Sequence, residues 1–199
     1  MSKSVTVIIP YKTDRGWLKD AIASVPKDVQ LLVSQGDGNW PENFNKVLSK
    51  ATGDYIKFLH EDDMLTPNCI EDSINTFLRT NADFIHGSVI ELYQWNKQVI
   101  WVPVKGSPTL HDMKLKNYIH SASLMYRREV FEKIGGFNET LNNQEEYEFN
   151  LRCLKEQFKI GYCVSLPLAY YRRHPAQKVR TITKEEIRKE KQMVLSWYE

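Results

Sequence analysis

Cysteine is scarce in this sequence, and its spacing excludes two common ways of stabilising a small protein. The 199 residues contain three cysteines, Cys69, Cys153 and Cys163, and no two of them form a Cys-x-x-Cys pair. An odd number of widely spaced thiols argues against a disulfide framework and against a structural zinc site. We therefore expect the protein to work in a reducing compartment, the cytoplasm.

Long apolar runs and a strong net charge are also missing. No stretch approaches the roughly 20 apolar residues that a membrane-spanning helix needs, and residues 1–4 lead into a short apolar run without the hydrophobic segment of a signal peptide. The formal net charge is only +2, which is too small for a protein that follows a nucleic-acid backbone. The sequence therefore predicts neither a membrane span nor a nucleic-acid partner.

Glycine-rich phosphate loops are a third absence. Neither Gly-x-Gly-x-x-Gly nor Gly-x-x-x-x-Gly-Lys-Ser/Thr occurs, which argues against dinucleotide-binding and P-loop proteins because they cradle phosphate on such loops. The composition is that of a globular protein, with 42% hydrophobic and 26% charged residues, and the length suits one domain. We expect a single domain with its core over residues 4–175 and a C-terminal helix over residues 181–199.

Short apolar strands alternate with helical patterns in the first half of the chain. Strands are expected at 5–9, where Pro10 should end the ladder, at 31–33 and at 55–59. The two helices between them should stop near Pro26 and at Gly53. This order predicts right-handed βαβ crossovers, and hence an α/β fold with a mostly parallel central sheet flanked by helices. Ligands of such sheets bind where the strands end.

The second half is less regular and predicts a small antiparallel addition. A hairpin is expected over 89–102, followed by a strand near 123–126. Apolar residues at helical spacing over 147–158 predict a helix that Gly161 should end. Thr183 begins a capping-box pattern for a last helix.

Three carboxylates and an imidazole crowd into four residues at the end of the third expected strand, His60-Glu61-Asp62-Asp63. Like charges so close repel each other unless a cation lies among them, and carboxylate oxygens suit Mg²⁺ or Mn²⁺. Such an ion would hold a diphosphate and stabilise the charge that develops as it departs. The equally weighted alternative is a solvated acidic turn that opens a helix capped by Thr66 and beginning at Pro67.

Three segments resemble the family 2 glycosyltransferases in order and spacing. They are VTVIIPY at 5–11, NKVLSKATGDYIKFLHEDD at 45–63 and RREVFEKIGGFNE at 127–139. The resemblance implies the GT-A fold, a nucleotide-binding α/β domain, and makes the acidic cluster the DXD motif that binds metal and nucleotide sugar. It implies Asp62 as the principal metal ligand, with Asp63 and Glu61 as close alternatives. His60 departs from the family, which commonly has an aspartate there.

The nucleotide contacts that the resemblance implies begin in the turns after the first two strands. Asp37 would contact base or ribose, although it could equally stabilise a glycine turn. The family usually has two adjacent acids in this second turn, where the chain has Ser34 and Gln35. Lys46 matches the family but could also be a solvated helix residue. The full set implied for the nucleotide sugar is Pro10, Tyr11, Asp37, Asn45, Lys46, Glu61, Asp62, Arg172, Arg173 and His174.

Glu145, Glu146 and Glu148 stand in the first turn of the helix expected near 147–158, and this stretch resembles the family's Glu-Asp motif, which supplies the catalytic base. Matched residue by residue, Glu146 takes the base position. Direct displacement at an anomeric carbon needs a carboxylate to accept the proton of the acceptor hydroxyl, and a single displacement inverts the configuration. The alternative is that the acids only stabilise the helix dipole.

Arg172, Arg173 and His174 follow a late strand and concentrate hydrogen-bond donors. Arginine grips phosphate oxygens with a fork of N–H groups, and a neutral histidine can ligate a metal. We expect all three to act on the diphosphate, with His174 also a metal ligand beside the acidic cluster; the alternative is a basic strip on the surface. His120, which precedes a strand, either faces the acceptor or is a core histidine.

Together these features predict a metal-dependent inverting glycosyltransferase that moves a sugar from a nucleoside-diphosphate sugar, with UDP the expected nucleotide, to a glycan hydroxyl. The first alternative is a nucleotide-sugar- or glycan-binding module with a weak site, suggested by the missing acids at Ser34, Gln35 and His60. The second is a sugar nucleotidyltransferase, although the glycine- and arginine-rich N-terminal loop of that class is absent. The domain is also expected to be one unit of a longer, multidomain protein.

Overall fold

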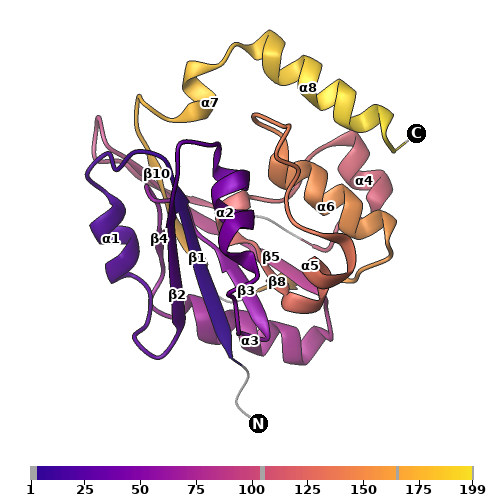
Figure 1. Ribbon diagram of the computed structural model, residues 1–199, viewed down its shortest axis with the longest axis horizontal. Helices are drawn as coiled ribbons and strands as arrows, with labels where there is room; N and C mark the ends of the chain where they lie inside the picture. Colours follow the sequence, from indigo (N-terminus) through magenta and orange to yellow (C-terminus); the bar gives the residue numbers. More distant parts are fainter. Residues whose placement is uncertain (1–3, 104–105, 165, 199) are drawn as a thin grey trace.

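The centre of the structure is a sheet that joins strands from both halves of the chain (Figure 1). The computed structural model describes residues 4–103, 106–164 and 166–198. Within these residues the sheet has six strands in the order β2-β1-β3-β8-β5-β9. Their bounds are β1 Val5–Tyr11, β2 Gln30–Gln35, β3 Tyr55–Phe58, β5 Phe84–Gly87, β8 Met125–Arg127 and β9 Ile160–Cys163.

Most strands of this sheet run in one direction. β1 is parallel to β2 and β3, and β5 is parallel to β9. β8 lies between β3 and β5 and is antiparallel to both. The prediction of an α/β fold with a mostly parallel central sheet is therefore confirmed. Parallel strands place their carboxyl ends at one edge of the sheet, and three strand ends there carry the site described below.

Helices cover both faces of the sheet (Figure 1). Because strand side chains alternate between faces, Val7 and Ile9 join one core with Phe77, whereas Ile8 joins the other with Phe44 and Phe149. Both cores are built from large apolar side chains that are shielded from water. The helices are α1 Leu18–Ala23, α2 Trp40–Leu48, α3 Cys69–Thr80, α4 Leu110–Leu115, α5 Arg128–Ile134, α6 Glu145–Lys155, α7 Lys178–Thr181 and α8 Lys184–Ser196, with a 3-10 turn at Ser121–Ser123.

A second, four-stranded sheet carries the late basic residues to the acidic cluster. Its order is β4-β10-β6-β7, with bounds β4 Met64–Leu65, β6 Val89–Tyr93, β7 Val99–Val102 and β10 Ala169–Arg173. β6 and β7 form the predicted antiparallel hairpin, with Lys97 at a φ of 54° in its turn. β4 follows the acidic cluster directly and pairs antiparallel with β10. This pairing brings residues 172–174 beside residues 60–63.

Two residues that were expected to end an element, Pro10 and Gly161, lie inside strands instead. Pro10 does not end β1: it lies opposite Ser34 in the β1–β2 register, at a point that the pairing with β3 no longer reaches. A missing N–H is tolerated there because only one neighbouring strand is present. Gly161 does not end a helix but lies in β9, where a Cβ would come within 2.8 Å of Thr80 Oγ1. α6 ends earlier, and Gln157 takes the left-handed conformation after it at φ 63°.

The helix ends were predicted with mixed success. Thr183 forms the predicted capping box and α8 follows it. α3 begins at Cys69 after Asn68, so the prediction of a Thr66 cap was wrong; the Thr66 hydroxyl donates instead to Pro167 O at 2.7 Å. α2 ends at Leu48, before Gly53. No helix among the described residues is both long and apolar enough to cross a membrane.

Candidate functional site

A cavity of about 720 Å³ opens at the carboxyl ends of β1, β2 and β3. We call it the strand-end cavity. One side is formed by the segments that leave these strands, residues 10–13, 37–40 and 60–62. Residues 142–146, which lead into α6, and Lys178 of α7 also line the cavity. The cavity thus lies where an α/β sheet is expected to bind its ligand.

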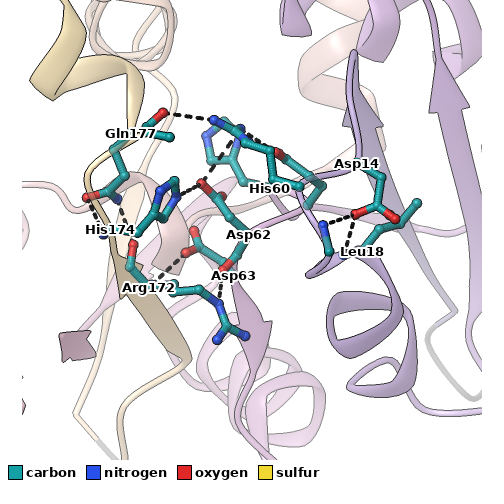
Figure 2. A network of polar contacts seen from close by, with 12 residues as sticks. Asp14, Leu18, His60, Asp62, Asp63, Arg172, His174 and Gln177 are labelled. Carbon is teal, nitrogen blue, oxygen red and sulfur yellow. Dashed lines mark hydrogen bonds and ion pairs between the residues drawn. The ribbon is translucent and has the colours of Figure 1, made fainter. Parts of the chain in front are cut away.

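Asp62 and His174 meet at this cavity. Asp62 Oδ2 lies 2.9 Å from His174 Nε2, and Figure 2 shows the two side chains facing each other. His174 is buried against the Trp17 ring, with centroids 4.2 Å apart. Gln177 fixes the position of His174 through the main chain. Its Oε1 accepts the main-chain N–H of His174 at 3.3 Å, and its Nε2 donates to the main-chain carbonyl of Arg172 at 2.7 Å. The end of β10 is therefore held against the acidic cluster.

The neighbouring carboxylates Asp62 and Asp63 have different environments. Burial opposes ionisation of Asp62, but the hydrogen bond from His174 and the nearby charges of His60 and Arg15 hold its pKa below the ordinary value. Burial and the charge of Asp62 raise the pKa of Asp63 well above its ordinary value. Asp63 Oδ1 accepts the main-chain N–H of Arg172 at 2.9 Å. Asp62 thus presents charge to the cavity, while Asp63 lies behind it.

Glu61 also lines the cavity but is neutralised by Arg15. Glu61 Oε1 accepts hydrogen bonds from two guanidinium nitrogens of Arg15, and a third Arg15 nitrogen donates to Ala176 O at 2.9 Å. Arg15 Nη2 lies 3.9 Å from Asp62 Oδ2. Arg15 was not among the predicted site residues, because an arginine in a loop belongs to no periodic pattern. Its position after β1 was the available signal.

His60 links the end of β3 to α6. His60 Nε2 lies 3.3 Å from Glu146 Oε1, and its ring packs edge-on against Phe58 and Trp40, with centroids 4.4 and 5.5 Å away. Burial lowers the pKa of His60, but the hydrogen bond to Glu146 and its negative charge outweigh burial and raise it to about 9. At neutral pH the pair is therefore an imidazolium and a carboxylate.

The three acids at the start of α6 have separate partners. Glu145 is buried and pairs with Lys178 Nζ at 2.9 Å, and burial together with the charge of Glu146 raises its pKa. Glu148 is buried and pairs with Arg152 at 2.9 Å. Glu146 lies at the cavity with His60 as its partner. Glu145 also lines the cavity but is buried in its pair with Lys178, so Glu146 is the better placed of the three to accept a proton from a bound substrate.

The donor atoms beside the cavity include one carboxylate that an oxygen-preferring divalent ion could use. Asp62 lines the cavity, and its oxygens are of the kind that Mg²⁺ and Mn²⁺ prefer. His174 Nε2, 2.9 Å from Asp62 Oδ2, would ligate an ion only after giving up its hydrogen bond to Asp62. No group of three or more His, Cys, Asp or Glu side chains in the described segments is placed to hold an ion. An ion bound here would therefore take most of its ligands from phosphate and water, as Mg²⁺ commonly does.

The predicted site residues divide into three groups. Those that line the strand-end cavity are Pro10, Tyr11, Asp37, Glu61, Asp62 and Glu146. Asp63, Arg172 and His174 lie behind them and are buried. Arg172 is occupied there, since its Nε donates to Asp62 O at 2.9 Å and its guanidinium lies over Trp17. The structure thus brings most of the predicted set together at one edge of the sheet.

Asn45, Lys46 and Arg173, which were also predicted to contact the nucleotide sugar, do not line the strand-end cavity. The Asn45 side-chain amide makes two hydrogen bonds to the main chain of Phe137. It donates to the Phe137 carbonyl at 2.8 Å and accepts the Phe137 N–H at 3.1 Å. Lys46 is exposed on α2. Arg173 points to the opposite side of β10 from Arg172 and pairs with Glu91 at 3.6 Å. The opposite direction follows from the alternation of side chains along a strand.

Two further cavity residues were also missed by the sequence analysis. Lys12 follows β1, lines the cavity and donates to Asp37 O at 2.6 Å. Lys178 lines it from α7. With Arg15 they place three cationic side chains around the space beside Asp62, a feature assembled from segments far apart in sequence. Lys12 could have been predicted to lie at the site because it directly follows a strand, whereas nothing in the sequence around Lys178 indicated such a position.

Comparison with known proteins identifies a family. Residues 12–135 match the sequence model of the family described as Glycosyl transferase family 2. An uncharacterized glycosyltransferase of Haemophilus influenzae is 27% identical over 146 residues, covering 71% of this chain and 50% of the relative. The O-antigen chain rhamnosyltransferase WbaN of Salmonella anatum is 26% identical over 154 residues, covering 71% and 49%. The chain thus spans about half the length of these relatives.

A solved structure shares the fold. Residues 1–349 of S. aureus TarS in complex with UDP-GlcNAc superpose with a TM-score of 0.70 at 15% identity, covering 90% of this chain and 61% of that one. At this identity the likeness concerns the fold, and it agrees with the GT-A architecture expected from the sequence. The family match covers more than half of the chain and includes both the acidic cluster and β8. The chain therefore belongs to the family 2 glycosyltransferases.

Proposed function

We propose that this domain transfers a sugar from a nucleoside-diphosphate sugar, with UDP as the nucleotide, to a hydroxyl of a glycan acceptor with inversion at the anomeric carbon. One observation carries the proposal. The strand-end cavity is lined both by the Asp62 carboxylate, after the end of β3, and by the Glu146 carboxylate, in the first turn of α6. A group for the diphosphate and a group for the acceptor proton thus face the same space.

The segments after β1 and β2 are the proposed nucleotide site. Tyr11 and Asp37 line the cavity there with a ring and a carboxylate that can accept from base or ribose. UDP is favoured because TarS, which has a similar fold, was solved in complex with UDP-GlcNAc. The Asn43 side chain holds the two segments together, since its Nδ2 donates to Tyr11 O and to Gly36 O at 3.1 Å each.

The diphosphate is proposed to lie beside Asp62. Asp62 and His174 would hold Mn²⁺ or Mg²⁺, which would neutralise the charge of the diphosphate and of the leaving nucleotide. Arg15, Lys12 and Lys178 line the same cavity; Arg15 and Lys178 are paired there with Glu61 and Glu145, and their remaining N–H groups can donate to phosphate oxygens. Charge-assisted hydrogen bonds of this kind are short and strong, especially away from bulk water.

Glu146 is the proposed general base. The acceptor oxygen attacks the anomeric carbon, the bond from that carbon to the diphosphate oxygen breaks, and the hydroxyl proton passes to Glu146. One such displacement inverts the configuration. His60, 3.3 Å away, holds the Glu146 carboxylate toward the end of β3. In this step the sugar is transferred to the acceptor oxygen and one proton is transferred to Glu146.

Donor hydrolysis followed by NMR tests the proposal. Wild-type protein with UDP-sugars and Mn²⁺ should release UDP slowly, and the first sugar anomer to appear should be inverted relative to the donor. Asp28→Asn, an exposed acid outside the site, is the matched control for variants of the acidic cluster. A retained configuration, or no UDP release from any donor, would contradict the proposal.

A binding module without transfer is the second candidate. It is favoured by His60, which replaces an acid that the family commonly has and ties up Glu146 in an ion pair. Such a module would bind UDP-sugars in the same cavity and release no UDP. The hydrolysis experiment therefore separates the two candidates.

A further inference from the structure

A second cavity adjoins the strand-end cavity. Its volume is about 240 Å³, and the two cavities share five lining residues, Ser121, Asn143, Gln144, Glu146 and Tyr171. We call it the amide cavity because four side-chain amides line it, those of Asn117, Asn143, Gln144 and Asn150. Its size suits a single sugar ring rather than an extended chain, and Glu146 stands on the boundary between the two spaces.

Two of these amides, Asn117 and Asn150, are held by their oxygen and keep their nitrogen for a ligand. Asn117 Oδ1 accepts the Ile119 N–H at 3.0 Å, and Asn150 Oδ1 accepts the Tyr126 hydroxyl at 2.9 Å. Among the described residues, neither amide nitrogen has a hydrogen-bond partner. Anchored amides with open N–H groups suit hydroxyl groups, which both accept and donate.

His120 and Tyr171 supply the ring wall of the cavity. Their rings meet edge-on with centroids 4.6 Å apart. His120 Nδ1 accepts the Ala122 N–H at 3.3 Å, and burial lowers the pKa of His120 to about 4. The imidazole is therefore neutral, with its proton on Nε2, where it serves as one more donor. The apolar face of a sugar packs well on such rings.

The charge of the amide cavity excludes anionic ligands. Among the described residues that line it, Glu146 is the only acid, and no lysine or arginine is present. The nearby Arg173 is paired with Glu91 at 3.6 Å. A phosphate or carboxylate placed here would find no cation of its own, because His60 is already paired with Glu146, and an unpaired charge is costly in a partly buried site.

We propose that the amide cavity is the acceptor subsite and takes one neutral sugar unit, with the reacting hydroxyl directed to Glu146. This inference rests on the proposed function and adds the chemical class of the acceptor. It assigns recognition to Asn117, Asn150 and His120, which do not line the strand-end cavity. Acceptors with a phosphate or a carboxylate at this unit are excluded by the same lining.

Ligand-observed saturation-transfer NMR on the whole chain tests the subsite, with Mn²⁺ present and with and without UDP. The probes are methyl glycosides of neutral hexoses and 6-deoxyhexoses, methyl glucuronoside and glycerol 3-phosphate. At least one neutral glycoside should receive saturation, and UDP should not displace it. Methyl glucuronoside and glycerol 3-phosphate should receive none. Stronger transfer to the charged probes, displacement by UDP, or no binding of any glycoside would overturn the proposal.

Two near-isosteric variants locate the binding. Asn117→Asp and Asn150→Asp keep the oxygen that accepts from Ile119 or Tyr126 and remove the amide donor, so each should weaken glycoside binding about two- to tenfold, the usual effect of one lost hydrogen bond. Affinity for UDP should be unchanged. Gln192→Glu, the same exchange at an exposed position of α8, is the control. Unchanged glycoside binding in both variants would overturn the assignment.

The two proposals fail in different ways. If wild-type protein binds no UDP, the proposed function fails, while the comparison of neutral with charged probes still decides the class of ligand in the amide cavity. If UDP binds and no neutral glycoside does, the acceptor subsite fails and the donor site stands.

Discussion

His60 Nε2 lies 3.3 Å from Glu146 Oε1, which joins the end of β3 to the first turn of α6 across 86 residues of sequence. The contact puts the residue that departs from the family pattern against the carboxylate assigned as the base. The acidic cluster and the start of α6 are therefore one site, and the first two predictions address the two partners of this contact.

Glu146→Gln should leave UDP affinity intact and lower the rate of sugar transfer by roughly 10²–10⁴-fold, because the change keeps the shape and removes the proton acceptor. Steady-state kinetics and calorimetry measure the two quantities. Glu148→Gln is the matched control, since that acid is buried in a pair with Arg152 and does not line the strand-end cavity. A near wild-type rate for Glu146→Gln would place the base elsewhere.

The His60–Glu146 ion pair should stabilise the fold in a pH-dependent way. The folded-state pKa of about 9 lies above the unfolded value of about 6.5, so the contribution is complete below pH ~6.5 and is lost as pH rises through ~9. His60→Gln should lower Tm by about 3–6 °C at pH 6 and by much less at pH 9.5. Thermal unfolding of both proteins checks this.

His111→Gln, a change of an exposed histidine outside the site, is the control for that comparison. A Tm difference that grows from pH 6 to pH 9.5 would show that His60 is not held as an imidazolium. NMR titration of the His60 ring gives an independent value.

Asp62→Asn should weaken UDP binding in Mn²⁺ far more than in EDTA, because the carboxylate is the proposed ligand on the cavity side of the acidic cluster. Calorimetry in both buffers measures this, with Asp28→Asn as the control at an exposed position. Equal affinities of wild type and Asp62→Asn in both buffers would refute the assignment of Asp62.

Arg15→Ala should reduce affinity for UDP more than affinity for uridine, since Arg15 lines the strand-end cavity and lies 3.9 Å from Asp62. A lost charge-assisted contact is worth about 1.5–3 kcal/mol, or roughly ten- to a hundredfold in Kd. Arg173→Ala is the matched comparison and should change UDP affinity less than about twofold, because Arg173 turns toward Glu91. The reverse order would mean that β10 presents its other face to the diphosphate.

The elements with local signals were the ones that could be predicted from sequence. β1 alternates between two cores, and Thr183 caps α8 through residues within one turn of it. Gly161 misled because glycine serves two purposes, a helix stop or a close contact between elements, and only the packing against Thr80 decides between them.

The location of the site in the fold could be predicted from the sequence, but the residues that line it could be predicted only in part. The strand ends identified the loop positions, since parallel strands expose them at one edge. Asn45 was assigned to the nucleotide, but its partner is Phe137, 92 residues later in the chain. Arg15 and Lys178 were missed because their roles depend on which segments pack together. Such contacts are set by tertiary structure and leave no mark in residue spacing.

The hydrogen bond from the Arg172 N–H to Asp63 has a consequence for sequence variation among relatives. The donor belongs to the main chain, so every residue except proline at position 172 can supply it. The acceptor is a side chain, and replacing Asp63 by an apolar residue would leave the N–H buried without a partner. Across homologues that share this docking of β10, position 63 should therefore stay a hydrogen-bond acceptor, whereas position 172 should vary but exclude proline.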